Sequence, residues 1–330
     1  MTFLDVLLRK ENNASNNSTT QTLLRQCPLY ALSVREDMTL IGTFLKYSND
    51  NYIELIETGR KFHHRLPPSK VSWHPNSMDT FASTSTSLRI WRTSDEKPAQ
   101  KLYPTGKSGN LTPCPMTSLS WNPFTTSRVV TSSIDTTLSV WDVEVGKMET
   151  QLIAHDKSVL DVCYGMSAHQ FASVSEDGSL RLFDSRDLDH STIIYEDSVP
   201  LLRVSWQENG SCNSNLLATI AADSPDVMLF DVRKPGFLTS VVRLGPKFPN
   251  ALAWSRTGSI AAGMSDGSVV ICQKIQDTIS QQEPNISKIK PGVTLPPVAG
   301  YTGGGVSNIA WIGDRLTIIH GSSISTSVVN

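Results

Sequence analysis

The sequence predicts an all-β fold, a β-propeller of seven four-stranded blades, and three observations support this prediction. The first is that all seven Trp of the 330-residue chain lie in one of two recurring contexts. Two of them end strands of alternating pattern, LRIW at Trp91 and LSVW at Trp141. The other five follow an aliphatic and a small residue, as in VSW and LAW, at Trp73, Trp121, Trp206, Trp254 and Trp311.

The second observation is the spacing of the strand-ending aromatic residues. Phe183 in LRLF and Phe230 in VMLF stand at the same place in the pattern as Trp91 and Trp141, so the successive spacings are 50, 42 and 47 residues. Repeats of about 40–45 residues with four strands each are typical of propeller blades. A β-sandwich also places aromatic residues in core strands, but it does not explain why two contexts recur along the chain.

The third observation is one stretch that reads as a complete blade, Tyr164 to Tyr195 with the strand SVLDVCY ahead of it. Its runs FASVS and SLRLFD are joined by Glu-Asp-Gly, a tight-turn signal because Gly adopts positive φ without a Cβ clash. The run STIIY follows. Four strands that are opened by a His and end their third strand on an aromatic-Asp pair are typical of a WD-type blade.

Before the propeller, residues 1–26 form a polar N-terminal tail that we expect to be disordered, because KENNASNNSTTQT is polar and low in complexity. Residues 27–330 form a single propeller. The first blade takes YALSVRE, LIGTFLKY, YIELIE and a strand near HHRLPP. The second and third run from VSW to LRIW and from MTSLSW to LSVWD, and the fourth is the stretch described above.

The fifth blade takes LLRVSW, LLATIAA and VMLFDVR, and the sixth takes NALAW, SIAAGMS and SVVICQ. The Pro- and Gln-containing segment at about 274–300 is expected to be an irregular exposed loop. The last blade, VSNIAW, LTIIHG and SISTSVV, has three strands, so the N-terminal tail is expected to add the fourth and close the ring. Counting alone leaves six or eight blades open.

Composition excludes several classes of function. A net charge of −2 argues against nonspecific electrostatic binding of nucleic acid. The chain contains no run of 18 apolar residues, so no membrane span is predicted. The N-terminal sequence lacks the basic region of a signal peptide. Five scattered Cys without a CxxC motif predict reduced thiols in a cytoplasmic and nuclear protein.

Three polar residues of the chain resemble a catalytic triad, namely His155, Ser173 and Asp177. A hydrolase would use them as base, nucleophile and orienting group, whereas in a WD blade a His, a Ser or Thr and an Asp bond to one another as scaffold. The Asp recurs as Asp135 and Asp266, six residues before the aromatic position, and a catalytic residue would not be copied into several repeats. We therefore predict a structural network, and no catalytic residue, metal site or cofactor. Phe183 lacks an indole N–H, so the network should be one bond shorter, a loss of about 1 kcal/mol.

Arg186 and Arg233 are the candidate partner-binding residues. They stand in FDSR and FDVR, directly after the third strands of consecutive blades. An Arg at a blade end can use its planar fork to bind a carboxylate or a backbone carbonyl of a partner. The alternative is a surface ion pair with the nearby Asp184 or Asp231, which contributes little to stability.

Several of these segments together resemble a known family. IGTFLKYSN, TSSIDTT, TQLIAHDKSV, FASVSEDGSLRLFD, HSTIIYED and PLLRVSW are similar to the WD-repeat family of the plant transparent testa glabra protein. The animal member of that family is a cullin-associated factor that scaffolds protein kinases. The resemblance covers roughly residues 27–273 and is densest between 129 and 206.

The resemblance implies a non-catalytic, monomeric platform that assembles protein complexes. Its plant members join transcription factors, and its animal members hold kinases. The animal members are also proposed substrate receptors of a cullin–RING ubiquitin ligase. In that ligase group a W-D-x-R motif engages the propeller adaptor, and residues 183–186 and 230–233 match this motif with Phe in place of Trp. The expected partners are therefore kinases, transcription factors or the ligase adaptor.

Overall fold

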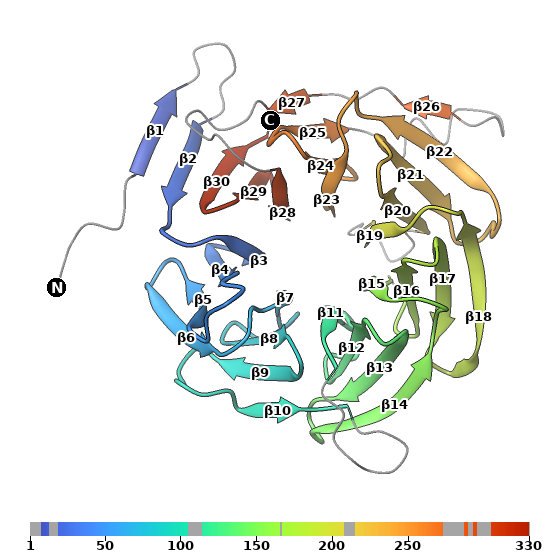
Figure 1. Ribbon diagram of the computed structural model, residues 1–330, viewed down its shortest axis with the longest axis horizontal. Coiled ribbons are helices and arrows are strands. Elements are labelled where there is room, and N and C mark those ends of the chain that lie inside the picture. The colour runs from blue at the N-terminus through green and yellow to red at the C-terminus, as the bar shows by residue number, and fades with distance from the viewer. Residues whose placement is uncertain are drawn as a thin grey trace.

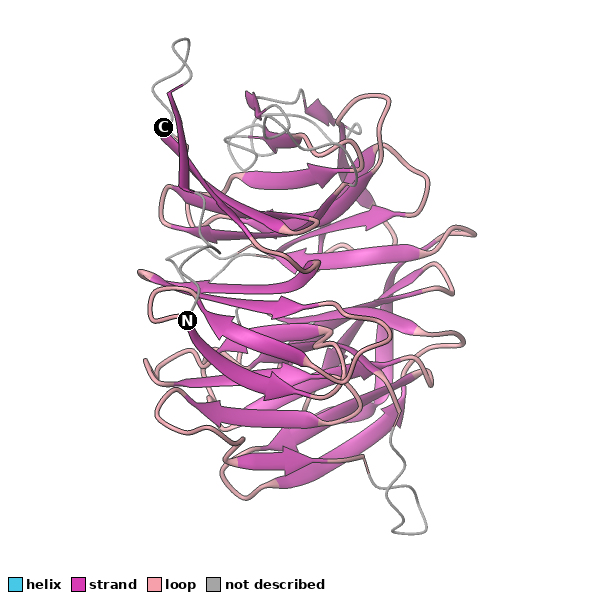
Figure 2. Ribbon diagram, turned by 60° about the vertical axis from the view of Figure 1, so that its left-hand side comes forward, coloured by secondary structure: helices cyan, strands magenta, loops and turns pink. Residues whose placement is uncertain are grey.

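The computed structural model describes residues 8–12, 19–104, 114–165, 167–207, 215–272, 287–289, 293–295 and 305–329. Over these residues the chain forms strands, turns and loops and contains no helix (Figure 2). The strands make seven sheets that surround a common axis (Figure 1). The predicted seven-bladed β-propeller is thus confirmed.

The first four blades are each built from four consecutive strands that pair antiparallel, with the first strand nearest the axis (Figure 1). Blade 1 contains β3 (Leu29–Arg35), β4 (Met38–Thr43), β5 (Asn51–Leu55) and β6 (Arg60–His64). Blade 2 contains β7 (Lys70–Trp73), β8 (Thr80–Thr84), β9 (Leu88–Arg92) and β10 (Gln100–Leu102). Blade 3 contains β11 (Met116–Trp121), β12 (Arg128–Ser133), β13 (Thr137–Asp142) and β14 (Lys147–Ile153). Blade 4 contains β15 (Val159–Tyr164), β16 (Gln170–Ser175), β17 (Ser179–Asp184) and β18 (Asp187–Glu196).

Blades 5 and 6 also take strands from the segment that was expected to be an irregular loop. Blade 5 contains β19 (Leu201–Trp206), β20 (Leu216–Ala221), β21 (Asp226–Asp231), β22 (Leu238–Arg243) and, parallel to β22, β26 (Ser287–Ile289). Blade 6 contains β23 (Pro249–Trp254), β24 (Ile260–Met264), β25 (Val269–Cys272) and β27 (Val293–Leu295). The segment at about 274–300 therefore differs from the prediction at β26 and β27. Without β27, the outer edge of β25 would lack a hydrogen-bonding strand. The rest of that segment lies outside the described residues.

Blade 7 joins the two ends of the chain. It contains β28 (Val306–Ile312), β29 (Arg315–His320), β30 (Ser323–Val328), β2 (Thr19–Leu24) and β1 (Leu8–Asn12). β2 pairs antiparallel with β30, with Thr22 opposite Ser325. β2 thus supplies the predicted fourth strand of the last blade. The expected disorder of residues 1–26 differs from the structure at β1 and β2, because the edge of β30 offers backbone groups to the tail. Residues 1–7 and 13–18 lie outside the described residues.

The hydrophobic core of the described residues is divided into seven clusters, one between each pair of neighbouring blades. Between blades 1 and 2, for example, Leu40 and Ile53 pack against Phe81 and Trp91. Between blades 7 and 1, Ile319 packs against Ile41, which completes the ring. Because both faces of each sheet are buried in this way, a single blade could not form a stable core alone.

The motif of an aliphatic residue, a small residue and Trp, which occurs five times, is explained by contacts between the inner strands of neighbouring blades. The indole Nε1 of Trp121 donates to the carbonyl of Ser72 in the preceding blade (3.3 Å). Trp254 donates to Ser205 (3.1 Å) and Trp311 to Ala253 (3.3 Å) in the same manner. The acceptor in each of these three cases is the small residue of the preceding blade's motif, so the motif links the inner strands of blades 2 and 3, 5 and 6, and 6 and 7.

Two ends of the propeller can be distinguished by their connections. In each antiparallel blade, the turn between the second and third strands and the loop to the next blade leave at one end, which we call the upper end. The turns that follow the first and third strands leave at the opposite, lower end. His155 and Asp177 therefore lie at the upper end, and Arg186 and Arg233 lie at the lower end.

Candidate protein-interaction surfaces

The structure brings His155, Ser173 and Asp177 together at the upper end of blade 4. His155 Nε2 lies 2.7 Å from Ser173 Oγ, and His155 Nδ1 lies 3.0 Å from Asp177 Oδ2. His155 is 2% exposed and Ser173 is fully buried. The loop that precedes the blade, its second strand and its second turn are tied together by these bonds.

Burial lowers the pKa of His155 to about 4, even though the nearby Asp177 carboxylate favours the charged ring. The imidazole is therefore neutral at pH 7, with Nδ1–H donating to Asp177 and Nε2 accepting from the Ser173 hydroxyl. Burial alone would raise the pKa of Asp177, but hydrogen bonds from Ser179 and from the backbone N–H of Asp156 lower it to about 2. The Ser173 hydroxyl thus donates a hydrogen bond to a buried, neutral imidazole ring.

Two further residues of this network were missed by the sequence reasoning. Ser179 Oγ lies 2.7 Å from Asp177 Oδ1 and 2.9 Å from His155 Nδ1. Arg181 donates to the carbonyl of Ala154 (3.0 Å) and so closes the network at the preceding loop. For Ser179 a sequence signal exists, because a Ser or Thr follows two residues after the Asp in EDGS, IDTT and SDGS.

The corresponding positions of other blades carry related structural bonds. In blade 2, Trp91 Nε1 donates to Ser83 Oγ (2.8 Å), which in turn lies 3.2 Å from His64 Nε2. In blade 3, Trp141 Nε1 donates to Thr131 Oγ1 (2.8 Å). A motif that recurs in several blades and connects strands within each of them is a scaffold feature.

Phe183 occupies the third-strand aromatic position of blade 4. Its ring stacks on Phe171, with centroids 5.4 Å apart and an interplanar angle of 10°. In blade 2, Trp91 stacks on Phe81 at 6.0 Å and 7°. The aromatic pair therefore packs with similar geometry in the two blades. The indole hydrogen bond forms only where the residue is Trp.

Arg186 and Arg233 have the same conformation in consecutive blades. Arg186 binds Asp184 through Nε and Nη2, at 2.9 Å and 2.6 Å, and Arg233 binds Asp231 at the same two distances. The Arg side chains remain 68% and 67% exposed. The sequence reasoning left a partner contact and a local ion pair as alternatives, and the local pair is formed in both motifs.

The local ion pair also orients each Arg side chain. A hydrogen bond from Arg186 lowers the pKa of Asp184 to about 2. Asp231 is more buried, which alone would raise its pKa, but the hydrogen bonds from Arg233 give a net lowering. Both carboxylates are therefore charged at pH 7. The pairs use Nε and Nη2, so the Nη1 group of each guanidinium keeps its two hydrogens for a partner.

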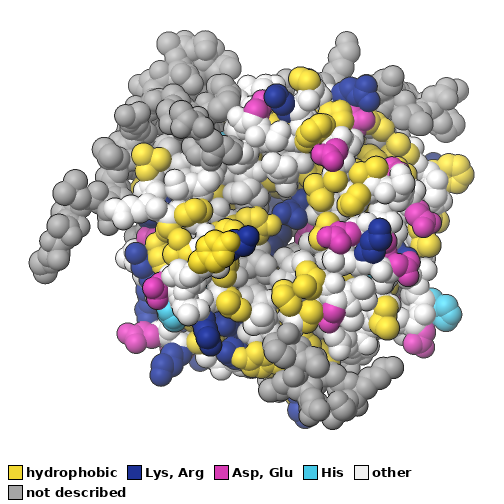
Figure 3. Space-filling model, viewed as in Figure 1, with side chains coloured by type: hydrophobic (Ala, Val, Ile, Leu, Met, Phe, Trp, Pro, Cys, Tyr) yellow, Lys and Arg dark blue, Asp and Glu magenta, His cyan; other side chains and the backbone are white. Residues whose placement is uncertain are grey.

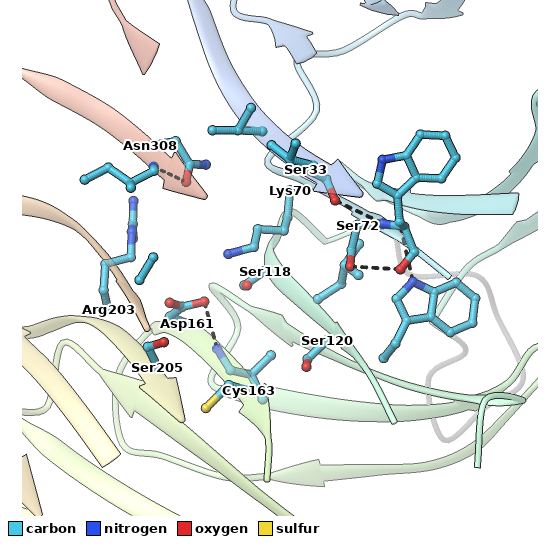
Figure 4. Close-up of a pocket in the computed structure, with 18 of the residues that line it drawn as sticks. Ser33, Lys70, Ser72, Ser118, Ser120, Asp161, Cys163, Arg203, Ser205 and Asn308 are labelled. Carbon is cyan, nitrogen blue, oxygen red and sulfur yellow. Dashed lines mark hydrogen bonds between the residues drawn. The ribbon is translucent and has the colours of Figure 1, made fainter. Parts of the chain in front are cut away.

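A cavity of about 1110 Å³ lies along the axis and is lined by the inner strands of all seven blades (Figure 4). Its polar side chains connect blades. Asp161 accepts from the N–H of Val204 in the next blade (3.2 Å), and Arg203 donates to the Tyr30 hydroxyl (2.9 Å). Lys70 and Arg203 both point into this space (Figure 4).

Other kinds of site find no support in the described part of the chain. No three His, Cys, Asp or Glu side chains lie close enough together there to hold a metal ion. Cys27, Cys114 and Cys163 are free thiols. In the same residues, no helix is long and apolar enough to cross a membrane.

Comparison with known proteins agrees with this architecture. Residues 107–142 and 146–184 match the family described as "WD domain, G-beta repeat". The chain is 38% identical over 231 residues to the "DDB1- and CUL4-associated factor 7 homolog" of Dictyostelium discoideum, a match that covers 65% of this chain and 70% of that protein.

Two fungal WD repeat-containing proteins are also similar. One, an uncharacterised protein of Schizosaccharomyces pombe, is 35% identical over 266 residues, which covers 69% of this chain and 60% of that protein. The other, from Saccharomyces cerevisiae, is 37% identical over 210 residues, which covers 51% of this chain and 40% of that protein. The fold, the repeated network and these similarities lead to one conclusion: the chain belongs to the WD-repeat family that includes the DDB1- and CUL4-associated factor 7 homolog.

Proposed function

We propose that this protein is a non-catalytic scaffold that binds segments of partner proteins on the two ends of a rigid propeller. The observation that carries the proposal is that the residues most similar to a catalytic triad form buried structural hydrogen bonds. His155, Ser173 and Asp177 are enclosed and bonded to one another, as are the related residues of blades 2 and 3. What the propeller presents to solvent is instead a set of loops held on stiff sheets, which suits recognition.

A second candidate function is that of a substrate receptor in a cullin–RING ubiquitin ligase. A relative that is 38% identical is named a DDB1- and CUL4-associated factor. Arg186 and Arg233 are exposed, and each is oriented by its own Asp. In this proposal the lower end of blades 4 and 5 docks on the ligase adaptor, and the upper end holds the protein to be modified.

The family resemblance supports a proposal for the classes of bound protein. Protein kinases and transcription regulators, including those joined by the plant transparent testa glabra members, are the proposed partners. We propose a location in both cytoplasm and nucleus, where such complexes assemble. Direct binding of nucleic acid is not part of the proposal, because the net charge is −2.

The test is affinity purification of the tagged protein from its own cells, with mass spectrometry of the recovered proteins. The wild type is compared with the double variant Arg186→Glu/Arg233→Glu. A matched control is Arg243→Glu, because Arg243 also forms an ion pair, with Asp226, and is 75% exposed, but it lies at the upper end. Exposed pairs such as Arg186–Asp184 contribute about 0–1 kcal/mol, whereas Asp231 is more buried, so the fold of each variant is checked by circular dichroism before recoveries are compared.

The ligase proposal predicts that a cullin and its propeller adaptor come with the wild type and with Arg243→Glu, and that their recovery falls at least about tenfold with the double variant. Equal recovery with the double variant would remove the support for that proposal while leaving the scaffold intact. The scaffold proposal predicts at least one partner protein in near-equal amount. If no protein is recovered with any form, the scaffold proposal itself is wrong.

A further inference from the structure

Exposed hydrophobic and basic side chains gather at the upper end of blades 1 and 2. The loop between β4 and β5 carries Phe44, Lys46 and Tyr47, and the loop between β6 and β7 carries Arg65 and Leu66. Tyr47 is 95% exposed, Phe44 43% and Leu66 37%. We call these five residues the aromatic-basic surface. Exposed aromatic side chains beside basic ones are typical of protein-binding sites.

The first of the two loops is held in one conformation by buried hydrogen bonds. The Asn51 side chain, which is fully buried, accepts from the N–H of Leu45 (2.8 Å) and donates to the carbonyls of Leu45 and Ser48 (3.1 and 3.0 Å). The N–H of Phe44 donates to the carbonyl of Pro28 (2.8 Å). Tyr47 is therefore presented by an ordered loop, so its binding would cost little ordering entropy.

The second loop lies directly against blade 1. A Cβ atom placed on Gly42 would come within 2.5 Å of Pro68 Cγ, so the Pro68 ring occupies the space that a side chain at position 42 would need. Phe44, two residues further along, contacts Tyr30 with ring centroids 5.8 Å apart. Phe44 and Pro68 also line the axial cavity together. The two loops thus form one continuous surface beside the mouth of the cavity.

The charge of this surface is opposite to that of the turns between the second and third strands of blades 3 to 6. The two loops and the first residue of β7 carry Lys46, Arg65 and Lys70 against one carboxylate, Asp50. Lys46 Nζ lies 5.6 Å from the centre of the Tyr47 ring, so a cation lies beside the most exposed aromatic ring. The corresponding turns of blades 3 to 6 expose carboxylates instead, at Asp135, Glu176, Asp223 and Asp266.

We infer that the aromatic-basic surface binds an extended segment of a partner protein in which Asp or Glu residues stand next to hydrophobic residues. The aromatic rings would take the hydrophobic side chains, and Lys46 and Arg65 would pair with the acidic ones. A nucleic acid or an anionic membrane would also meet the carboxylates of blades 3 to 6, whereas a short segment contacts blades 1 and 2 alone. Figure 3 shows hydrophobic and basic side chains around the hollow at the axis.

This inference rests on the proposed function to the extent that the occupant is a protein, but it uses the opposite end from Arg186 and Arg233. The two proposals can therefore fail separately. The Arg186→Glu/Arg233→Glu variant should bind the same segments as the wild type, because its substitutions lie at the lower end.

The experiment is selection of a random peptide library, displayed on phage, against the immobilised full chain. Selected peptides are synthesised with a fluorescent label, and their dissociation constants are measured by anisotropy. The variants are Tyr47→Ala and Lys46→Glu/Arg65→Glu. The control is Ile153→Ala, because Ile153 is an 80% exposed hydrophobic residue at the upper end of blade 3. A labelled oligothymidine and vesicles containing phosphatidylserine serve as the other polyanionic probes.

We expect the selected peptides to be enriched in acidic and hydrophobic residues. Tyr47→Ala and Lys46→Glu/Arg65→Glu should each weaken their binding at least about tenfold, and Ile153→Ala by less than about twofold. The inference is overturned if no peptide is selected, if the selected peptides lack acidic residues, or if their binding is unchanged in both variants. It is also overturned if oligothymidine or the vesicles bind more tightly than the peptides and lose binding in Lys46→Glu/Arg65→Glu.

Discussion

Replacement of Ser173 by Ala tests whether the His155 network is structural. In the wild type the Ser173 hydroxyl donates to His155 Nε2 over 2.7 Å, and both groups lie in the interior. The substitution removes the hydroxyl and leaves Nε2 without its donor in a site that water does not reach. An unsatisfied buried acceptor costs about 1–3 kcal/mol, so we expect the free energy of unfolding to fall by about 2 kcal/mol.

The expected shift in melting temperature follows from the size of the domain. With an unfolding entropy of about 2.1 cal/mol/K per residue, a chain of this length has about 0.7 kcal/mol/K, so 2 kcal/mol corresponds to about 3 °C. The assay is urea and thermal unfolding followed by Trp fluorescence and circular dichroism. The matched control is Ser191→Ala in the outer strand of the same blade, where Ser191 is exposed. That variant should stay within about 0.5 kcal/mol of the wild type.

Two results would refute this reasoning. If Ser173→Ala is as stable as Ser191→Ala, the hydrogen bond does not hold the blade together as the geometry implies. If the wild type shows a measurable turnover that Ser173→Ala abolishes without any loss of stability, then Ser173 is a nucleophile and the scaffold interpretation is wrong. Loss of stability together with retained partner binding is the expected combination.

Two further predictions concern pH and a turn. Because burial lowers the pKa of His155 to about 4, the unfolded state binds a proton that the folded state does not, and stability should fall as pH drops below about 6.5. This effect costs about 2 kcal/mol at pH 5 from His155 alone, and equal urea midpoints at about pH 7.5 and pH 5 would contradict it. Gly178→Ala should destabilise the protein by more than about 3 kcal/mol, since φ is +83° and the added Cβ would lie 1.9 Å from the carbonyl oxygen of Asp197. Gly59→Ala, with φ of +67° but open space around it, should cost about 1 kcal/mol in the same urea titration.

The fold itself could be predicted because large aromatic residues mark each repeat at regular positions. Trp91 and Trp141 are each 1% exposed, and their side chains fill equivalent places between blades. The strand-and-turn pattern around them predicted the inner three strands of every blade. Residues 293–295 could not be assigned from the sequence, because their pairing with β25 is decided by an edge that only the assembled blade creates.

The candidate site could be predicted in part for the same reason. Asp177 follows a repeated spacing, and His155 and Ser173 stand where a WD blade places the partners of that Asp, so their proximity could be predicted from the sequence. Arg181 was not, because its bond to the Ala154 carbonyl joins segments 27 residues apart and depends on how the preceding loop lies over the blade.

Sequence alone therefore determined the type, the period and the order of the repeats, because each repeat encodes its strands locally through aromatic residues, turns and alternation. The tertiary structure fixed their number at seven. Tertiary structure alone decided which groups reach solvent together. Phe44 and Pro68 belong to different loops, yet both line the axial cavity, with the Pro68 ring lying against Gly42. Arg186 and Arg233 likewise lie at the same end of neighbouring blades because blade 5 packs against blade 4. Local sequence determines each strand, whereas the juxtaposition of loops depends on the packing of one sheet against the next.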